Sequence, residues 1–192
     1  MTPRLLPACA AAIAGIVLLA GCTPLGSDAS ASVSASPTAL PTEVVDAQAP
    51  EGTVDPCDLI KKKTLSSMVG TQMAAGRFNN ALSNDGRNIC EWRPKSDQKS
   101  EPRVQVEVNW GYPDVAAHRA LAEEAFGKTR DVKRSIAGAT DAYTTPSRRT
   151  LGMSVDEYFV KVSYIRPATD GSTAGDITFE IARKVAKNLA SS

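Results

Sequence analysis

The side chains that could catalyse a reaction are few in this chain and lie far apart. His118 is the single histidine, so a Ser-His-Asp or Cys-His nucleophilic site would have to use it. The acidic pairs Glu123-Glu124 and Asp156-Glu157 are adjacent in sequence, and adjacent residues point to different faces of a helix or strand. By themselves they make poor acid–base pairs. We therefore predict no catalytic residue, and a hydrolase that uses His118 is kept as an alternative.

The motifs of common metal, nucleotide and hydrolase sites do not occur in this sequence. The patterns G-x-S-x-G, H-E-x-x-H and G-x-x-x-x-G-K-[ST] are all missing. The cysteines and the one histidine of the later part of the chain lack the clustered spacing that zinc requires. We predict no metal and no cofactor, and we expect a binding or interaction function.

Cys22 follows a segment that is typical of an export signal. Met1–Arg4 carries one positive charge, and Leu5–Ala20 is an apolar stretch of ~24 Å as a helix, short for a permanent membrane span. Leu19-Ala20-Gly21-Cys22 resembles a bacterial lipobox, in which the cysteine thiol receives a diacylglyceryl group and the chain is cut before it. We predict cleavage between Gly21 and Cys22 and lipidation of Cys22. The alternative is a plain secretory signal with an incidental cysteine.

Composition divides the chain into three parts. Residues 1–21 form the predicted lipoprotein signal peptide. Residues 22–53 hold Cys22 and a segment rich in Ala, Ser, Thr and Pro, with no aromatic residue, which is typical of a disordered tether. A flexible chain of this length spans ~30 Å. Residues 54–192 fit one globular domain. We therefore expect a domain held by a lipid anchor on the extracytoplasmic face of the cell membrane.

The predicted domain is basic, although the whole chain is close to neutral. The chain has a net charge of +1, but residues 54–192 keep 21 of the 22 Lys and Arg and 17 of the 21 acidic residues, which leaves +4. This charge is too mild to indicate a nucleic-acid partner, and we predict none. The basic runs Lys61-Lys62-Lys63, Lys133-Arg134 and Arg148-Arg149 either contact anionic headgroups or wall polymers, or form a solvated surface, which we favour.

Two cysteines remain in the domain once Cys9 and Cys22 are assigned to the signal and the anchor. Cys57 and Cys90 form an even pair in an exported, oxidising setting, which predicts a disulfide between them. A redox-active pair is the alternative, but no C-x-x-C pattern supports it. The disulfide would close a loop of about thirty-three residues and stabilise the fold by ~3–4 kcal/mol.

Hydrophobic periodicity predicts an α+β domain. Strict alternation over 103–110 places Val104, Val106, Val108 and Trp110 on one face of a strand. Runs of strands with helices between them favour a mainly antiparallel sheet flanked by helices. Further strands are expected at 89–94, 131–136, 140–145 and 150–165, and helices at 55–70 (from Asp55, with a second piece from Thr64), 113–127 and 175–190 (capped by Asp176).

Two expectations concern the core. The helix over 113–127 is predicted to bury Val115, Leu121, Ala122, Ala125 and Phe126. We also expect Trp92 and Trp110 in the core, because each lies on a predicted strand beside other apolar positions.

The combination of these motifs resembles a family of uncharacterised actinobacterial lipoproteins that share a domain of unknown function. The matching residues are the lipobox, the tether, Asp55-Pro56-Cys57 and Cys90-x-Trp92, while Thr140 departs from the glycine usual before Asp141-Ala142. The resemblance implies a surface lipoprotein with a disulfide and an antiparallel sheet flanked by helices, similar to PsbP-like domains. It implies no activity.

The sequence as a whole predicts a non-enzymatic, membrane-anchored envelope protein. Its partners are the membrane, through the lipid anchor, and an unknown protein, wall polymer or small ligand. Two alternatives stay open, namely a carrier of a lipid or other small apolar ligand in an internal cavity, and the hydrolase that uses His118.

Overall fold

A computed structural model describes residues 49–96, 102–165 and 171–191. These residues belong to the second of two units into which the chain divides, Glu43–Ser192. The predicted signal peptide, Cys22 and most of the predicted tether lie outside the described residues. Within the described ranges, no helix has the length and hydrophobicity that crossing a membrane requires.

The domain is an α+β fold, as the sequence predicts, built on one antiparallel sheet of seven strands in the order β1-β2-β3-β7-β6-β5-β4. Strands that are consecutive in sequence pair directly, except that β3 pairs with β7 and thereby joins the two halves of the sheet. The elements are α1 (Lys62–Val69), β1 (Arg77–Phe78), β2 (Arg87–Trp92), β3 (Arg103–Asn109), α2 (Val115–Phe126), β4 (Arg130–Asp131), the short 3-10 helix Lys133–Ser135, β5 (Ala139–Thr144), β6 (Thr150–Val155), β7 (Tyr158–Ile165) and α3 (Gly171–Leu189).

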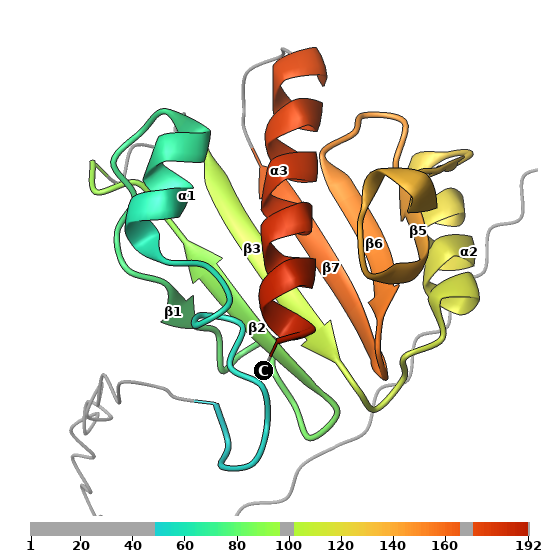
Figure 1. Cartoon of the computed structure of the whole chain (residues 1–192), viewed down its shortest axis with the longest axis horizontal. Helices are drawn as coiled ribbons and strands as arrows, with labels where there is room; N and C mark the ends of the chain where they lie inside the picture. Colours follow the sequence, from blue (N-terminus) through green and yellow to red (C-terminus); the bar gives the residue numbers. More distant parts are fainter. Residues whose placement is uncertain (1–48, 97–101, 166–170, 192) are drawn as a thin grey trace, which may run out of the picture. The chain divides into compact units, whose positions relative to one another are not determined.

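The main core lies between one face of the sheet and the helices α1 and α3 (Figure 1). The alternation in β3 places Val104, Val106 and Val108 on this face, and all three are fully buried. The i, i+4 spacing in α3 presents Ile181, Val185 and Leu189 to them. The predicted alternation of β3 is therefore confirmed at these three valines.

The N-terminal helix begins later than predicted. The carboxylate of Asp55 accepts a hydrogen bond from the amide of Cys57 at 2.7 Å, which closes a turn instead of capping an α-helix. The backbone is extended at Lys61, and α1 starts at Lys62. Residues 56–60 form turns instead of the predicted first helical piece, and the piece predicted from Thr64 begins two residues earlier, at Lys62. Gly70 ends the helix in the left-handed conformation, as expected.

Two of the five residues predicted to face inward from α2, Val115 and Ala122, do so, and the other three are exposed. Ala122 is its buried residue, and Val115 packs beside it against Tyr143 and Phe159, whereas Leu121 and Phe126 are 59% and 62% exposed. The positions of the apolar residues along α2 do not by themselves show which side of the helix is buried. The two aromatic rings of the sheet occupy the space beneath the helix, so a small side chain fits over them.

Four smaller predictions also need correction. Residues 150–165 form the hairpin of β6 and β7 with a turn at Asp156, where φ is +50°, and residues 131–136 are largely a 3-10 turn. The helix α3 starts at Gly171, so Asp176 lies within it and pairs with Arg148. Trp92 is 1% exposed, as predicted, but Trp110 follows the last residue of β3 and is half-buried.

Candidate functional site

The predicted disulfide is present and anchors the N-terminal segment to the sheet. Cys57 bonds to Cys90 on β2, with a Cα–Cα distance of 5.2 Å, and Cys90 is fully buried. The adjacent Asn88 is also buried and donates from its amide nitrogen to the Thr53 hydroxyl and the Val54 carbonyl, both at 2.8 Å. Residues 53–60 therefore enter the core at a defined position on β2.

A surface pocket lies where β1 pairs with β2, and Glu91, the residue after Cys90, is part of its lining. The segment before and after β1 is held to β2 by backbone hydrogen bonds from Ala74 to Arg93 and from Asn79 to Ile89, each of 2.8 Å. Gly76 is required here, because a Cβ at this position would lie 2.7 Å from both Cys90 Sγ and Trp92 Nε1. The chain can therefore cross directly over the Cys90 and Trp92 side chains.

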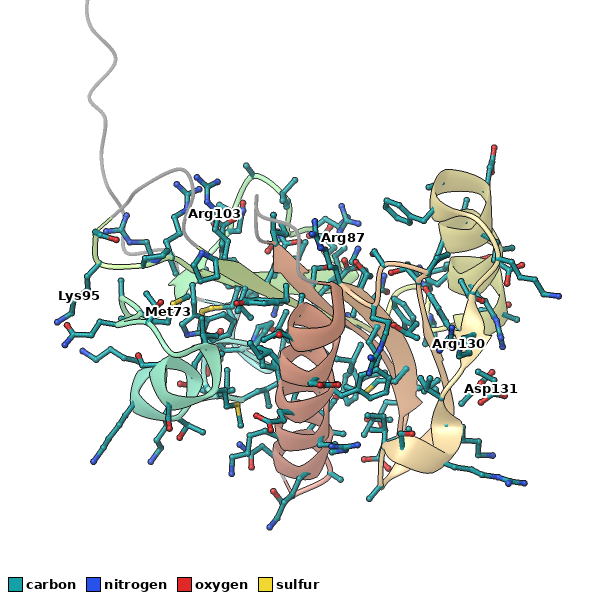
Figure 2. All side chains as sticks on the ribbon, turned by 90° about the horizontal axis from the view of Figure 1, so that it is seen from above. Met73, Arg87, Lys95, Arg103, Arg130 and Asp131 are labelled. Atoms are coloured by element: carbon teal, nitrogen blue, oxygen red, sulfur yellow. A yellow bond between two sulfur atoms is a disulfide. The ribbon has the colours of Figure 1, made fainter. Side chains whose placement is uncertain are left out.

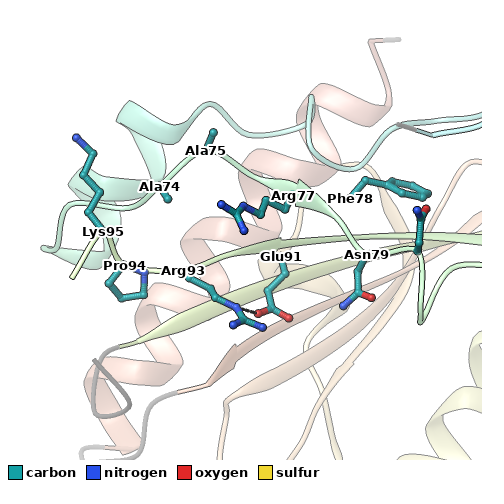
Figure 3. Close-up of a pocket in the computed structure, with 10 residues that line it drawn as sticks. Ala74, Ala75, Arg77, Phe78, Asn79, Glu91, Arg93, Pro94 and Lys95 are labelled. Carbon is teal, nitrogen blue, oxygen red and sulfur yellow. Dashed lines mark hydrogen bonds and ion pairs between the residues drawn. The ribbon is translucent and has the colours of Figure 1, made fainter. Parts of the chain in front are cut away.

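The pocket has a volume of about 500 Å³ and is open to solvent (Figure 3). We call it the basic pocket. Its apolar wall comes from two alanines, one phenylalanine and one proline, and its polar wall from two asparagines, three cations and one carboxylate. The lining residues are Ala74, Ala75, Arg77, Phe78, Asn79, Asn80, Glu91, Arg93, Pro94 and Lys95.

The cations of the basic pocket outnumber its single carboxylate. Arg77 lies directly opposite Glu91 in the register of β1 and β2, while Glu91 forms its ion pair with Arg93. Figure 3 shows Arg77, Glu91 and Arg93 together, with Lys95 at the end of the pocket beside Pro94. Among the described contacts, Arg77 and Lys95 have no carboxylate partner, and both are exposed. The pocket therefore carries an excess of two positive charges.

This arrangement is suited to holding an anionic group. Arginine presents several N–H donors in one plane, a geometry that matches carboxylate and phosphate oxygens in pairs. The amides of Asn79 and Asn80 add donors and acceptors at the same wall. Of the ten lining residues, Glu91 is the one carboxylate and none is His, Cys, Ser or Thr. The pocket thus has groups for binding but no acid–base pair.

His118 belongs to α2 and lies over Phe159 of β7, away from the basic pocket. Its Nε2 donates to the carbonyl of Tyr112 at 2.8 Å, and its ring stacks on Phe159 with 3.7 Å between ring centroids and an interplanar angle of 3°. The rings of Tyr112 and His118 meet edge to face, with 5.5 Å between their centroids. The described contacts of His118 are thus a carbonyl and two aromatic rings, and they favour a packing role for this side chain.

Four acidic residues line a second pocket. Asp156 and Glu157, in the β6–β7 turn, line a pocket of about 650 Å³ together with Asp55 and Asp58 from the N-terminal segment. Burial, followed by the charge of Glu157, raises the pKa of the neighbouring Tyr158. Among the described residues, no group of three or more His, Cys, Asp or Glu side chains is placed to hold a metal ion.

The basic runs singled out in the sequence do not form the basic pocket. Lys61-Lys62-Lys63 is exposed at the start of α1, and Lys133-Arg134 is exposed in the 3-10 turn. Arg148 binds Asp176 at 3.0 Å and covers the ring of Phe179, which fastens the β5–β6 turn to α3. Sequence reasoning missed Arg77, Arg93 and Lys95 because they come from two separate segments. Alternating basic residues at 93 and 95 are the signal that could have indicated them.

The space between α3 and the sheet, where a carrier of apolar ligands would need its cavity, is filled by side chains. Val106, Val162, Ile181 and Val185 all have no exposed surface. No observation among the described residues favours the carrier or the hydrolase over a binding surface.

Comparison with known proteins identifies the family. No curated protein and no solved structure matches the chain. A family model described as "Protein of unknown function (DUF3558)" matches residues 17–191, a range that contains Cys22 as well as Cys57 and Cys90. Because this match covers nearly the whole chain, the protein belongs to the DUF3558 family.

Proposed function

We propose that this protein is a non-enzymatic binding module of the cell envelope, and that it binds an anionic ligand in the basic pocket. In this proposal a lipid on Cys22 holds it on the extracytoplasmic face of the cell membrane. Cleavage between Gly21 and Cys22 makes Cys22 the first residue of the mature protein. The tether then gives the domain a reach of ~30 Å from the membrane surface.

The proposal of a lipid anchor rests on the sequence. The apolar segment before Cys22 is too short for a permanent span, and a lipobox-like motif closes it. The Cys57–Cys90 disulfide agrees with an oxidising compartment outside the cytoplasm. The family match begins at residue 17, so the lipobox-like residues 19–22 fall inside it.

The proposal that the ligand is anionic rests on one observation, which is the excess of positive charge in the basic pocket. Arg77 and Lys95 line the same pocket as Arg93 without a carboxylate of their own among the described contacts. Cations that share a pocket repel one another, which raises the free energy of the protein. An anion bound among them lowers it again. Phe78 and Pro94 provide an apolar surface for the rest of the ligand.

Isothermal titration calorimetry of the full chain in a neutral detergent tests this proposal, with inorganic phosphate and acetate as probes. Arg77→Gln should weaken binding by about tenfold, since hydrogen bonds to charged groups contribute about 1.5–3 kcal/mol. Lys128→Gln is the matched control, because Lys128 is an exposed cation outside the pocket. Equal affinity of Arg77→Gln, Lys128→Gln and the unchanged protein would contradict the proposed site, as would binding of neither anion.

A further inference from the structure

One half of the sheet leaves a face without a helix over it in the described part of the chain. α1 and α3 pack on one side of the sheet, and α2 packs on the other side over Tyr143 and Phe159. Figure 2 shows Arg87 and Arg103 on the same side as α2 and away from α1 and α3. The part of this side formed by β1, β2, β3 and the end of β7 is called the open face below.

Strand register identifies the side chains of the open face. Residues directly opposite one another in antiparallel strands point to the same face. Arg77 is opposite Glu91, Glu91 is opposite Gln105, and Gln105 is opposite Ser163, so these four form one row. The remaining members of the open face, two residues apart along their strands, are Arg87, Ile89, Arg93, Arg103, Glu107, Lys161 and Ile165.

The open face is basic, and its carboxylates are already neutralised. Glu107 is 2% exposed and lies between Lys161, at 2.6 Å, and Arg87, at 3.9 Å. The two cations keep 35% and 37% of their side-chain surface exposed, so they cover the carboxylate and still present donors outward. Glu91 is paired with Arg93. Five cations against two paired carboxylates leave the face with a net charge of +3.

Two arginines of the open face lie at the same end of β2 and β3, and one of them, Arg103, has no carboxylate partner among the described contacts. Trp92 is opposite Val104 where the pairing of β2 and β3 ends, so Arg93, which follows Trp92, and Arg103, which precedes Val104, both lie at this end of the sheet. Like charges that lie near one another repel. Arg103 is also half-buried. A bound anion would remove this repulsion.

The dimensions of the open face exceed those of a small anion. Arg77 on β1 and Lys161 on β7 are separated by three strand spacings, ~14 Å at the usual spacing of neighbouring strands. The basic pocket forms one end of this path. Arg103 extends it at the start of β3, while Arg87 and Lys161, which flank Glu107, extend it towards the other end of β3. Four of the five cations are arginines, the residue whose planar donors match phosphate oxygens.

We propose that the basic pocket is one end of an extended site for a linear phosphate-bearing polymer, which lies across β1, β2, β3 and β7 and is bound by Arg103, Arg87 and Lys161. This inference rests on the proposed function of the basic pocket and adds the class of its ligand. A chain-like ligand fits better than a bilayer. Because α2 stands on the same side as the open face, a flat surface meets α2 before it reaches these strands (Figure 2).

The test compares pyrophosphate with long-chain polyphosphate by titration calorimetry of the full chain in a neutral detergent. Polyphosphate should bind more tightly than pyrophosphate at equal phosphate concentration. Arg103→Gln should weaken polyphosphate binding about tenfold, the effect of one lost charged contact, and leave pyrophosphate binding unchanged. Arg77→Gln should weaken both. Arg130→Gln, at an exposed position on β4 at the far edge of the sheet, is the control and should change neither.

The outcomes separate this inference from the proposed function. If Arg77→Gln weakens pyrophosphate binding while Arg103→Gln and Arg130→Gln have equal effects on polyphosphate, the extended site is wrong and the pocket stands. If neither probe binds, both proposals fail. Displacement of polyphosphate by detergent micelles carrying phosphatidylglycerol, at equal phosphate concentration, would overturn the polymer in favour of a membrane surface. Arg103 has no described ion pair, so its substitution should leave the fold intact, and circular dichroism checks this.

Discussion

Removing the disulfide should cost this domain a large share of its stability. The proposed change is the double variant Cys57→Ala/Cys90→Ala, which abolishes the cross-link without leaving a buried polar side chain in place of Cys90. The bond closes a loop with a sequence separation of 33 residues. With the chain-entropy expression for a loop of this length, the free energy of unfolding should fall by ~3.7 kcal/mol at 25 °C. Stabilities of single domains are about 5–15 kcal/mol, so the loss is substantial.

The structure indicates where this loss should appear. The loop contains α1 and β1, and it carries buried residues of the main core, including Leu59, Ile60 and Leu65. It also carries Arg77, Asn79 and Asn80 of the basic pocket. Weakening the attachment of this segment to β2 should therefore loosen the pocket before the rest of the sheet.

Urea denaturation of the full chain, followed by circular dichroism, measures the effect. The unchanged protein is compared with the double variant and with itself under a reducing agent, and Cys22→Ala serves as a cysteine substitution outside the domain. The variant and the reduced protein should show the same loss. A difference of less than about 1 kcal/mol, or free thiols at both positions in the unreduced protein by mass spectrometry, would refute the reasoning.

Three further predictions follow from individual residues. Cys22→Ala should shift the protein out of the detergent phase in a phase-partition assay, and an unchanged partition would be evidence against the lipid anchor. Gly152→Ala should lower the free energy of unfolding by about 1–3 kcal/mol in urea, because its Cβ would lie 2.6 Å from the Tyr143 ring; no loss would mean that the ring moves freely. Burial, and then the charge of Glu107, raises the pKa of Tyr143 to about 12, above the ordinary value of 10.0. The unfolded chain therefore loses this proton first, so stability should fall as the pH rises from 10 towards 12, and Tyr143→Phe should reduce the fall; identical alkaline curves would contradict the assignment.

The parts of the fold that depend on local periodicity could be predicted. The alternation over β3 and the i, i+4 spacing in α3 are both set by side chains that must face one core. The Cys57–Cys90 pairing also could be predicted, since two cysteines remained in the domain. The residues at which the helices begin were harder to predict from the sequence. Asp55 has the type and spacing of a helix cap, yet its carboxylate closes a turn whose cysteine is bonded to β2.

The candidate site could not be predicted in the same way. Sequence reasoning sought cations in consecutive runs. Two of these runs are exposed, and in the third Arg148 contacts Asp176 and Phe179 on α3 while Arg149 is half-buried. For α2, the prediction is confirmed at Val115 and Ala122 and wrong at Leu121 and Phe126, because the rings of Tyr143 and Phe159 leave room for a small side chain above them.

The sequence by itself determined the class of the fold, the disulfide partners, and the segment on which the proposal of a lipid anchor rests. These features depend on composition, local spacing and the number of cysteines. Only the tertiary structure decided that Arg77, Arg93 and Arg103 meet on one face, because β1, β2 and β3 are joined by a register that no local pattern records. Charge that is spread along the chain becomes concentrated when strands pair, and the candidate site arises from that pairing.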